Sequence, residues 1–264
     1  MVHSSQFMEN NKLTEVFAWG KKNLLNIYCT AGYPFIDSTA KVIFALQDNG
    51  ADMVEIGMPY SDPIADGPVI QESNMAALAN GMNMHLLFEQ LEAIKEKVHI
   101  PVILMGYFNP VLQFGVEKFC EAAERAGISG IIIPDLPMHE YEALYQPLFI
   151  KHNLSFNFLI TPETDKKRLK KADRLSEGFI YAVSSSSVTG KTNTAFKEDH
   201  FDFIRRAKLK KPVMIGFGIR DKASFRHACR FANGAIIGSA YINALKKNND
   251  IELVTREFIK DIIE

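Results

Sequence analysis

Eight short segments of the chain are almost continuously apolar, and they are separated by longer segments with a different pattern. The eight cover residues 24–30, 53–57, 102–107, 130–134, 155–161, 179–184, 213–217 and 235–238. A strand has this pattern when helices cover both faces of its sheet, as they do in parallel sheets. We therefore interpret the eight segments as strands of one parallel sheet.

Segments with helical spacing lie between these strands. Apolar residues recur every three or four positions in residues 37–49, 84–97, 116–126, 140–152, 166–175, 199–208 and 221–231. Several of these segments end in typical helix stop signals, such as "QDNG" and "ERAG". A further helix is expected over residues 14–22, before the first strand.

The order of these elements predicts the fold. Eight strand–helix units in about 250 residues are typical of a (β/α)₈ barrel. We predict an α/β protein, a single (β/α)₈ TIM barrel with an extra N-terminal helix. No Pro/Ser-rich linker or change in composition divides the chain, so residues 1–264 are expected to form one domain. A doubly wound sheet is the alternative, because one miscounted strand would change the assignment.

Charge and composition exclude several kinds of partner. The chain of 264 residues carries 30 basic and 31 acidic side chains, a net charge of −1, which provides no field for nucleic acid or an anionic membrane. The N-terminus lacks a signal-peptide core, and no apolar run approaches the roughly 20 residues that span a bilayer. We expect a cytoplasmic protein.

The cysteines and histidines do not predict a metal site. Cys29, Cys120 and Cys229 lie far apart and form no CxxC pair, as expected for reduced thiols. The seven histidines show no HExxH motif and no close ligand spacing. We therefore expect neither a metal nor a Ser–His–Asp triad.

The stretch "VEIGMPYSDPIADGPVIQ" contains two candidate catalytic acids. Glu55 lies in the second apolar strand, and alternation places it on the same face as Met53 and Gly57. Asp66 follows in a loop that three prolines stiffen. At the mouth of a barrel, two carboxyl groups in different surroundings can hold different protonation states. A structural carboxylate at Glu55 and a turn residue at Asp66 are the alternatives.

Glycines after the last two strands predict a phosphate site. "VMIGFGIRDKASF" places Gly216 and Gly218 after the seventh strand, and "IIGSA" places Gly238 and Ser239 after the eighth. Main-chain N–H groups at these two loops bind phosphate in many barrels. A dinucleotide fingerprint is rejected, because Asp221 stands where its third glycine would be.

A run of small polar residues follows the sixth strand, in "YAVSSSSVTGKTNTAF". A P-loop is rejected because Ser185 replaces the first glycine that the motif requires. The composition favours a lid that closes over the site, with an ordinary surface loop as the alternative.

These motifs together resemble the alpha subunit family of tryptophan synthase. The match includes the acid-bearing stretch, "YAVSSSSVTG", "GFGI", "IIGSA", "YFNP" at residues 107–110 and "PDLP" at residues 134–137, from about Thr14 to the C-terminal helix. The resemblance implies retro-aldol cleavage of indole-3-glycerol phosphate into indole and glyceraldehyde 3-phosphate. It also implies a pyridoxal-phosphate-bearing beta subunit as partner in an αββα heterotetramer, with no cofactor in this chain.

The resemblance also implies roles for particular residues. Glu55 corresponds to the general acid–base, Asp66 to the carboxylate that binds the indole N–H, and Tyr181 to a tyrosine near the glycerol hydroxyls. Thr189 corresponds to the lid threonine that contacts the aspartate loop. Two further groups are implied: a phosphate site of Gly190, Phe217, Gly218, Ile219, Gly238 and Ser239, and an indole pocket of Tyr28, Met105, Tyr107 and Leu159.

Some positions depart from the family, and other functions are considered. Ser185 and Ser187 replace the usual arginine and glycine of the lid, and Tyr60 replaces a phenylalanine. The alternatives are a non-catalytic activator of a beta subunit, a standalone lyase that releases indole, and a barrel isomerase. The isomerase is disfavoured, because "CTAG" and "LITP", at the ends of the first and fifth strands, contain no acid.

Overall fold

The computed structural model describes residues 11–18, 20–183, 201–216 and 218–264. Within these residues one parallel sheet has the strand order β5-β4-β3-β2-β1-β9-β8-β7-β6. All eight apolar segments form strands, and the segment predicted at 155–161 contributes two short ones. The strands are β1 (Leu24–Thr30), β2 (Met53–Gly57), β3 (Val102–Met105), β4 (Gly130–Ile132), β5 (Ser155–Phe156), β6 (Leu159–Ile160), β7 (Ile180–Val183), β8 (Val213–Gly216) and β9 (Gly234–Ile237).

The chain itself closes the sheet into a barrel between β5 and β6. The backbone N–H of Asn157 donates to Ile131 O in β4 at 2.9 Å, and Phe158 O accepts from the N–H of Tyr181 in β7 at 3.0 Å. One passage of chain is therefore bonded to both ends of the sheet. This closure confirms the predicted barrel and excludes the doubly wound alternative, whose sheet stays open.

Asn157 explains why this passage is divided into two strands. Its side-chain Oδ1 accepts from the N–H of Phe179 at 2.8 Å, and its Nδ2 donates to Ser155 O at 3.0 Å. The buried amide thus bonds to backbone groups at the point where the regular ladder stops. From sequence, the apolar run looked continuous, because a single asparagine does not reveal such a break.

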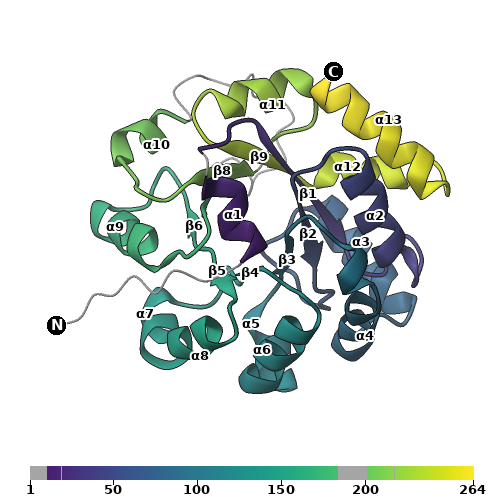
Figure 1. Ribbon diagram of the computed structural model, residues 1–264, viewed down its shortest axis with the longest axis horizontal. Helices are drawn as coiled ribbons and strands as arrows, with labels where there is room; N and C mark the ends of the chain where they lie inside the picture. The colour runs from purple at the N-terminus through teal and green to yellow at the C-terminus, as the bar shows by residue number, and fades with distance from the viewer. Residues whose placement is uncertain (1–10, 19, 184–200, 217) are drawn as a thin grey trace.

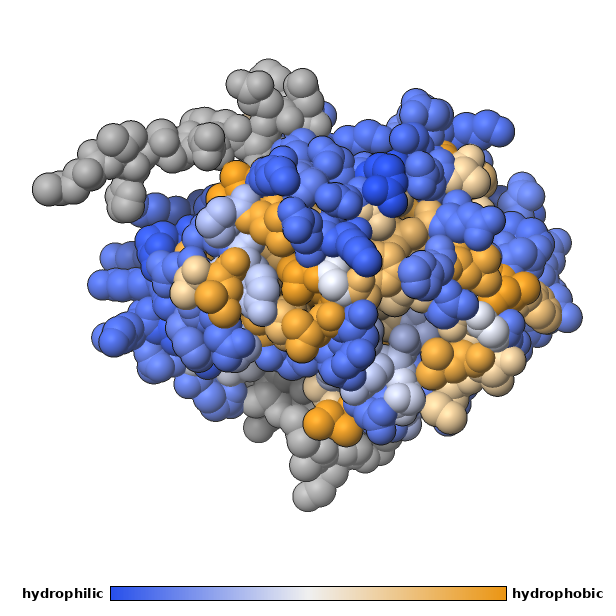
Figure 2. All heavy atoms as spheres, turned by 90° about the horizontal axis from the view of Figure 1, so that it is seen from below, coloured by the Kyte–Doolittle hydropathy of each residue, from blue (hydrophilic) through white to orange (hydrophobic). Residues whose placement is uncertain are grey.

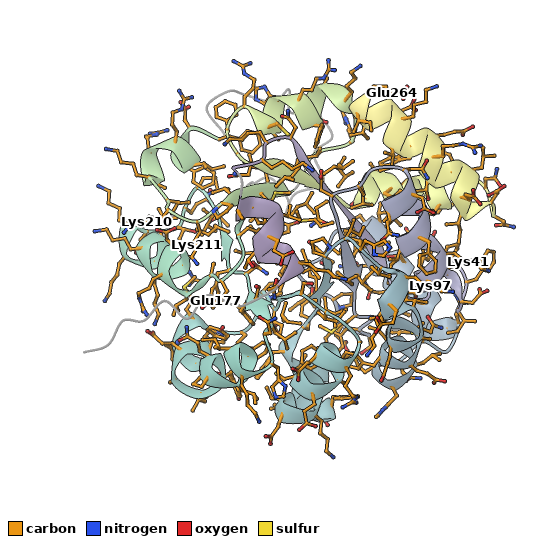
Figure 3. The ribbon with its side chains drawn as sticks, viewed as in Figure 1. Lys41, Lys97, Glu177, Lys210, Lys211 and Glu264 are labelled. Atoms are coloured by element: carbon orange, nitrogen blue, oxygen red, sulfur yellow. The ribbon has the colours of Figure 1, made fainter. Side chains whose placement is uncertain are left out.

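Helices surround the barrel (Figure 1), and exposed charged side chains such as Lys41 and Lys210 lie at their outer rim (Figure 3). The predicted helices are present with ends shifted by a few residues. The helical elements are α1 (Lys12–Ala18), α2 (Ser38–Asp48), α3 (Pro68–Ala79), α4 (Met84–Ile94), η1 (Lys95–Lys97), α5 (Phe108–Phe114), α6 (Val116–Arg125), α7 (Met138–Glu140), η2 (Tyr141–Tyr145), α8 (Gln146–Lys151), α9 (Lys166–Leu175), α10 (Asp202–Ala207), α11 (Lys222–Cys229), α12 (Ser239–Leu245) and α13 (Ile251–Ile263).

The helix predicted at 140–152 is the least regular of these. It begins two residues earlier and contains a π-helical segment, η2. Pro147 follows in the first turn of α8 and has no N–H to donate. Helices α3, α5 and α12 were not predicted, and in the case of α3 the prolines before it suggested only a loop. In the structure Gly67 is the N-cap and Pro68 the first helical residue, a position that proline favours.

Two hydrophobic cores are separated by the barrel wall. Alternation in β2 sends Met53 into an inner core, whereas Val54 and Ile56 belong to an outer core between the sheet and its helices. This is the alternation that the sequence predicted. Glu55 shares the inward direction of Met53 and is completely buried.

Helix α1 covers one end of the barrel, at the centre of the view in Figure 1. Its Leu13 and Phe17 pack into the inner core with residues such as Leu24 and Phe179. The side chain of Asn11 fixes the start of the helix: its Oδ1 accepts from the N–H of Leu13 at 2.9 Å, and its Nδ2 donates to Ser129 O at 2.9 Å. The extra N-terminal helix is therefore part of the barrel core.

We expect Leu13→Ala to lower the free energy of unfolding by about 2–5 kcal/mol, because the substitution leaves a cavity at a fully buried position. Urea unfolding followed by circular dichroism measures the change. Glu15→Ala, in the same helix but exposed, is the control. Equal effects of the two substitutions would contradict the role assigned to Leu13.

Candidate active site

A cavity of about 460 Å³ opens at the carboxyl ends of the strands. A smaller adjoining cavity of about 70 Å³ shares Tyr28, Asp66 and Met105 with it. Every site residue predicted from sequence within the described ranges lines one of the two, except Gly216, which is the last residue of β8 and lines neither. The large cavity holds Tyr28, Glu55, Asp66, Met105, Tyr181, Gly218, Ile219, Gly238 and Ser239, and the small one adds Tyr107 and Leu159.

Glu55 lies in the cavity wall, with its carboxyl group removed from water. The side chain has no exposed surface, and its Oε2 accepts one hydrogen bond, from Asn26 Nδ2 at 3.1 Å. Burial raises the pKa of Glu55 from 4.5 to about 8, the Asn26 bond opposes the rise, and the nearby Asp66 adds to it. At neutral pH this residue is therefore mostly a carboxylic acid that can also lose its proton.

Asp66 lies in a more polar setting on the loop between β2 and α3. Its Oδ2 accepts from the hydroxyl of Tyr107 at 3.2 Å, and the same hydroxyl accepts from the N–H of Ala65 at 3.0 Å. Partial burial raises the pKa of Asp66 to about 6, and the Tyr107 bond opposes the rise. Tyr107 thus holds the loop through two hydrogen bonds, one with the backbone N–H of Ala65 and one with the carboxylate of Asp66.

The two acids differ in proton affinity within one cavity. At neutral pH a pKa of about 8 keeps Glu55 mainly protonated, and a pKa of about 6 keeps Asp66 mainly ionised. This difference is the property of an acid–base pair in which one group gives a proton while the other stabilises positive charge. The ring of Tyr60, one of the departures from the family, lies 5.3 Å from that of Tyr107 and so contributes to the same loop support.

Two tyrosines point into the barrel, and one of them, Tyr181, belongs to the inner core. Tyr28 of β1 and Tyr181 of β7 are nearly fully buried, and burial raises the pKa of both well above its usual value. Each ring occupies space that a glycine leaves: a Cβ on Gly57 would overlap the Tyr28 hydroxyl, and one on Gly216 would overlap the Tyr181 hydroxyl. The glycines at the ends of β2 and β8 therefore shape the cavity by lacking side chains.

The far end of the cavity contains the predicted phosphate residues. Gly218 has φ of +75°, a conformation that favours glycine, and it lies in the loop after β8. Gly238 is the N-cap of α12, and Ser239 is its first residue. Gly190, Phe217 and Thr189, together with the lid segment that contains Ser185 and Ser187, lie outside the described residues.

The structure adds lining residues that the sequence analysis missed. Ile70 of α3, Arg220, Ile236 of β9 and Asn243 of α12 also line the large cavity. Arg220 follows the "GFGI" motif directly, so its position next to the glycines was a usable signal. Asn243 had no such signal, because only the direction of α12 brings it to the cavity. No group of His, Cys, Asp and Glu suited to a metal occurs among the described residues.

The fold and the cavity together define a class of protein. A parallel barrel whose cavity holds one buried and one partly buried acid of unequal proton affinity, opposite a glycine-lined end, is an acid–base enzyme of the TIM-barrel class. The family model described as tryptophan synthase alpha chain matches residues 16–261, and the chain belongs to this family. The resemblance read from the sequence motifs is thereby confirmed.

Individual relatives agree with this assignment. The chain is 50% identical over 241 residues to the tryptophan synthase alpha chain of Flavobacterium psychrophilum, covering 90% of this chain and 93% of the relative. It is 47% identical over 255 residues to that of Flavobacterium johnsoniae, covering 96% and 99%.

Solved structures show the same fold. The alpha subunit from Legionella pneumophila matches with a TM-score of 0.85 at 31% identity over 95% of both chains. Aminoacrylate-bound tryptophan synthase from M. tuberculosis matches with a TM-score of 0.82 at 30% identity, over 96% of this chain and 99% of that chain.

We expect Glu55→Gln to stabilise the protein at high pH. The native state binds the Glu55 proton more tightly than the unfolded chain, so the free energy of unfolding falls as pH rises from about 4.5 to about 8. Glutamine removes this loss. The variant should exceed wild type by about 3–5 kcal/mol at pH 9 and by much less at pH 4, as measured by urea unfolding.

The exposed Glu89 provides the control for this comparison, because Glu89→Gln changes the same chemical group in contact with water. A stability difference between Glu55→Gln and wild type that is the same at both pH values would contradict the linkage.

Proposed function

We propose that this chain catalyses the alpha reaction of tryptophan synthase, the retro-aldol cleavage of indole-3-glycerol phosphate to indole and glyceraldehyde 3-phosphate. It is a carbon–carbon lyase of tryptophan biosynthesis, as its family membership supports. The observation that carries the mechanism is that Glu55 and Asp66 line one cavity with unequal pKa values, about 8 and about 6.

Glu55 performs two proton transfers in this proposal. As the acid, it gives its proton to C3 of the indole ring, which makes the bond to the side chain ready to break. As the resulting carboxylate, it takes the proton of the side-chain hydroxyl while the electrons of the C–C bond return to the ring. Glu55 ends protonated, so the cycle consumes no proton, and a pKa of about 8 suits both directions near neutral pH.

Asp66 stabilises the positive charge that protonation places on the ring. As a carboxylate, it accepts a hydrogen bond from the indole N–H, and this bond strengthens as the nitrogen becomes positive. The hydroxyl of Tyr107 holds Asp66 Oδ2 and leaves the second oxygen for the substrate. Protonated Asp66 could not play this part, so activity should fall as pH drops through about 6.

The remaining lining residues divide between the two ends of the substrate. Tyr28, Met105, Tyr107 and Leu159 form the indole end, which is why the small cavity is mostly aromatic and apolar. Tyr181 lies near the glycerol hydroxyls. Backbone groups of Gly218, Ile219, Gly238 and Ser239 bind the phosphate, and we extend this set to Gly190 and Phe217. Thr189 is the lid threonine that contacts the aspartate loop.

Two other functions remain as alternatives. A non-catalytic activator of a beta subunit has no physical need for a fully buried acid, whose burial disfavours its charged form. That cost favours an active enzyme. A standalone lyase that releases free indole would use the same residues, so it differs only in its partner.

We propose a tryptophan synthase beta subunit as the partner, in an αββα heterotetramer that carries pyridoxal phosphate in the beta subunit. The alpha chemistry requires only acid–base groups, so we expect no cofactor here. Large hydrophobic side chains are exposed at Ile64, Leu112 and Leu144, and Figure 2 shows hydrophobic patches between hydrophilic residues. Exposed apolar surface of this kind is used for protein association.

We further propose that residues 1–264 act as one domain in the cytoplasm, without nucleic-acid or membrane partners. None of the helices within the described ranges is long and apolar enough to cross a membrane. The basic and acidic side chains of the chain nearly balance in number. The chain therefore has no general electrostatic attraction to nucleic acid or to an anionic membrane.

We expect Glu55→Gln to abolish cleavage, with a loss of at least about 10³-fold in kcat, and Asp66→Asn to lower kcat by about 10²-fold. Glutamine keeps the shape of Glu55 but cannot transfer a proton. The kcat of both variants is measured as the release of indole from indole-3-glycerol phosphate. Indole is monitored by absorbance, with and without a beta subunit. Activation of the beta subunit should survive in Glu55→Gln.

Asp62→Asn is the matched control, because Asp62 lies in the same loop as Asp66 but is exposed and lines neither cavity. Near wild-type indole release by Glu55→Gln would refute the acid–base assignment. Wild-type chain that releases no indole in either arm, but activates a beta subunit, would favour the non-catalytic alternative.

A further inference from the structure

Asn26 is a polar residue in the middle of the apolar strand β1. Alternation along "LLNIYCT" places Leu24, Asn26 and Tyr28 on the inward face. In the parallel register, Asn26 lies opposite Met53 of β2 and Ile236 of β9. Both neighbours belong to the inner core, and Asn26 has no exposed surface. An amide in such a layer costs free energy relative to an apolar residue of similar size.

The amide has one strong polar contact, and that contact is with Glu55. Asn26 Nδ2 donates to Glu55 Oε2 at 3.1 Å. Among the residues that the structure describes, neither Asn26 Oδ1 nor Glu55 Oε1 has a hydrogen-bond partner. The pair is therefore bonded on one side only, and each residue keeps one buried oxygen unbonded.

We propose that Asn26 is a positioning residue for Glu55, whose amide holds Oε2 in place and thereby makes Oε1 the oxygen that carries and transfers the proton. This inference rests on the proposed function. An oxygen that accepts an N–H bond keeps its electron pair engaged, and a protonated oxygen is a poorer acceptor. The proton is therefore more stable on Oε1. The same bond restrains rotation of the carboxyl group, so Oε1 keeps one direction through the catalytic cycle.

The groups around Glu55 define what the bond does electrostatically. Tyr28 and Cys29 of β1, Tyr181 of β7 and Asp66 of the β2–α3 loop interact with the Glu55 charge. None of these four is a cation, and burial together with Asp66 raises the pKa of Glu55 to about 8, whereas the Asn26 bond lowers it. Asn26 therefore keeps the carboxylate form accessible for the second proton transfer.

Two variants of the full-length chain test this assignment. Asn26→Leu removes the donor with little change in volume, and Asn26→Asp keeps the shape but replaces the donor with a second acid. Infrared difference spectroscopy on ¹³C-glutamate-labelled protein follows the carboxyl band that disappears in Glu55→Gln. Its titration midpoint reports the pKa of Glu55 without any substrate.

We expect Asn26→Leu to raise this midpoint by about one pH unit, the effect of losing one hydrogen bond to a charged group. Asn26→Asp should raise it further, because two neighbouring acids oppose each other's ionisation. In the cleavage assay, Asn26→Leu should lower kcat about tenfold and change KM less than about twofold. If Asn26 had only a structural role, the midpoints would not rise in this order, and kcat would not fall while KM stays nearly constant.

Met53→Leu is the control, because Met53 lies opposite Asn26 in the inner core and its thioether has no N–H to donate to Glu55. It should leave the midpoint unchanged. A midpoint that stays at the wild-type value in both Asn26 variants overturns the proposal, as does a rise in KM at constant kcat. If Asn26→Leu does not fold, Asn26→Asp alone decides, by its midpoint.

Failure of the proposed function is recognised separately. In that case the wild-type chain cleaves no indole-3-glycerol phosphate, while the midpoints still establish whether Asn26 controls Glu55. If the midpoints shift but no cleavage occurs, Asn26 does control the pKa of Glu55, but the contact has no role in the cleavage of indole-3-glycerol phosphate.

Discussion

The site depends on the burial of one carboxyl group, that of Glu55, inside the barrel. A carboxylate in that position is disfavoured by the loss of water, and this is why the pKa of Glu55 rises to about 8. The structure opposes the rise only partly, through the single bond from Asn26. The cavity thus contains an acid whose proton affinity suits proton transfer near neutral pH.

Such a group is tolerated because the barrel separates its two cores. The outer core, between the strands and the helices, extends around the whole sheet and contains most of the buried apolar residues. The inner core is small, and α1 closes it at one end through Leu13 and Phe17. Polar residues can therefore replace apolar ones at the inner face near the carboxyl ends of the strands without opening the outer core. Catalytic residues of TIM barrels lie at this end.

The two acids acquire different properties from different kinds of structure. Glu55 lies on a strand, so its neighbours are fixed by register and its environment is apolar. Asp66 lies on a loop, where Tyr107 bonds both its carboxylate and the preceding N–H of the loop. Loop and strand thus produce unequal proton affinities from two chemically similar side chains, and the alpha reaction as proposed requires that inequality.

The eight strand segments, the barrel, the shared face of Met53 and Glu55, and the family could all be predicted from the sequence, because they follow from local patterns and from short motifs. Three features are visible only in the folded chain: the barrel closes at Asn157, α1 fills its end, and Asn26 contacts Glu55 while Asn243 lines the large cavity. These features are contacts between residues far apart in the chain, set by register and helix direction. A single buried asparagine in an apolar run has no periodic signal, so its partner becomes visible only when the strands are side by side.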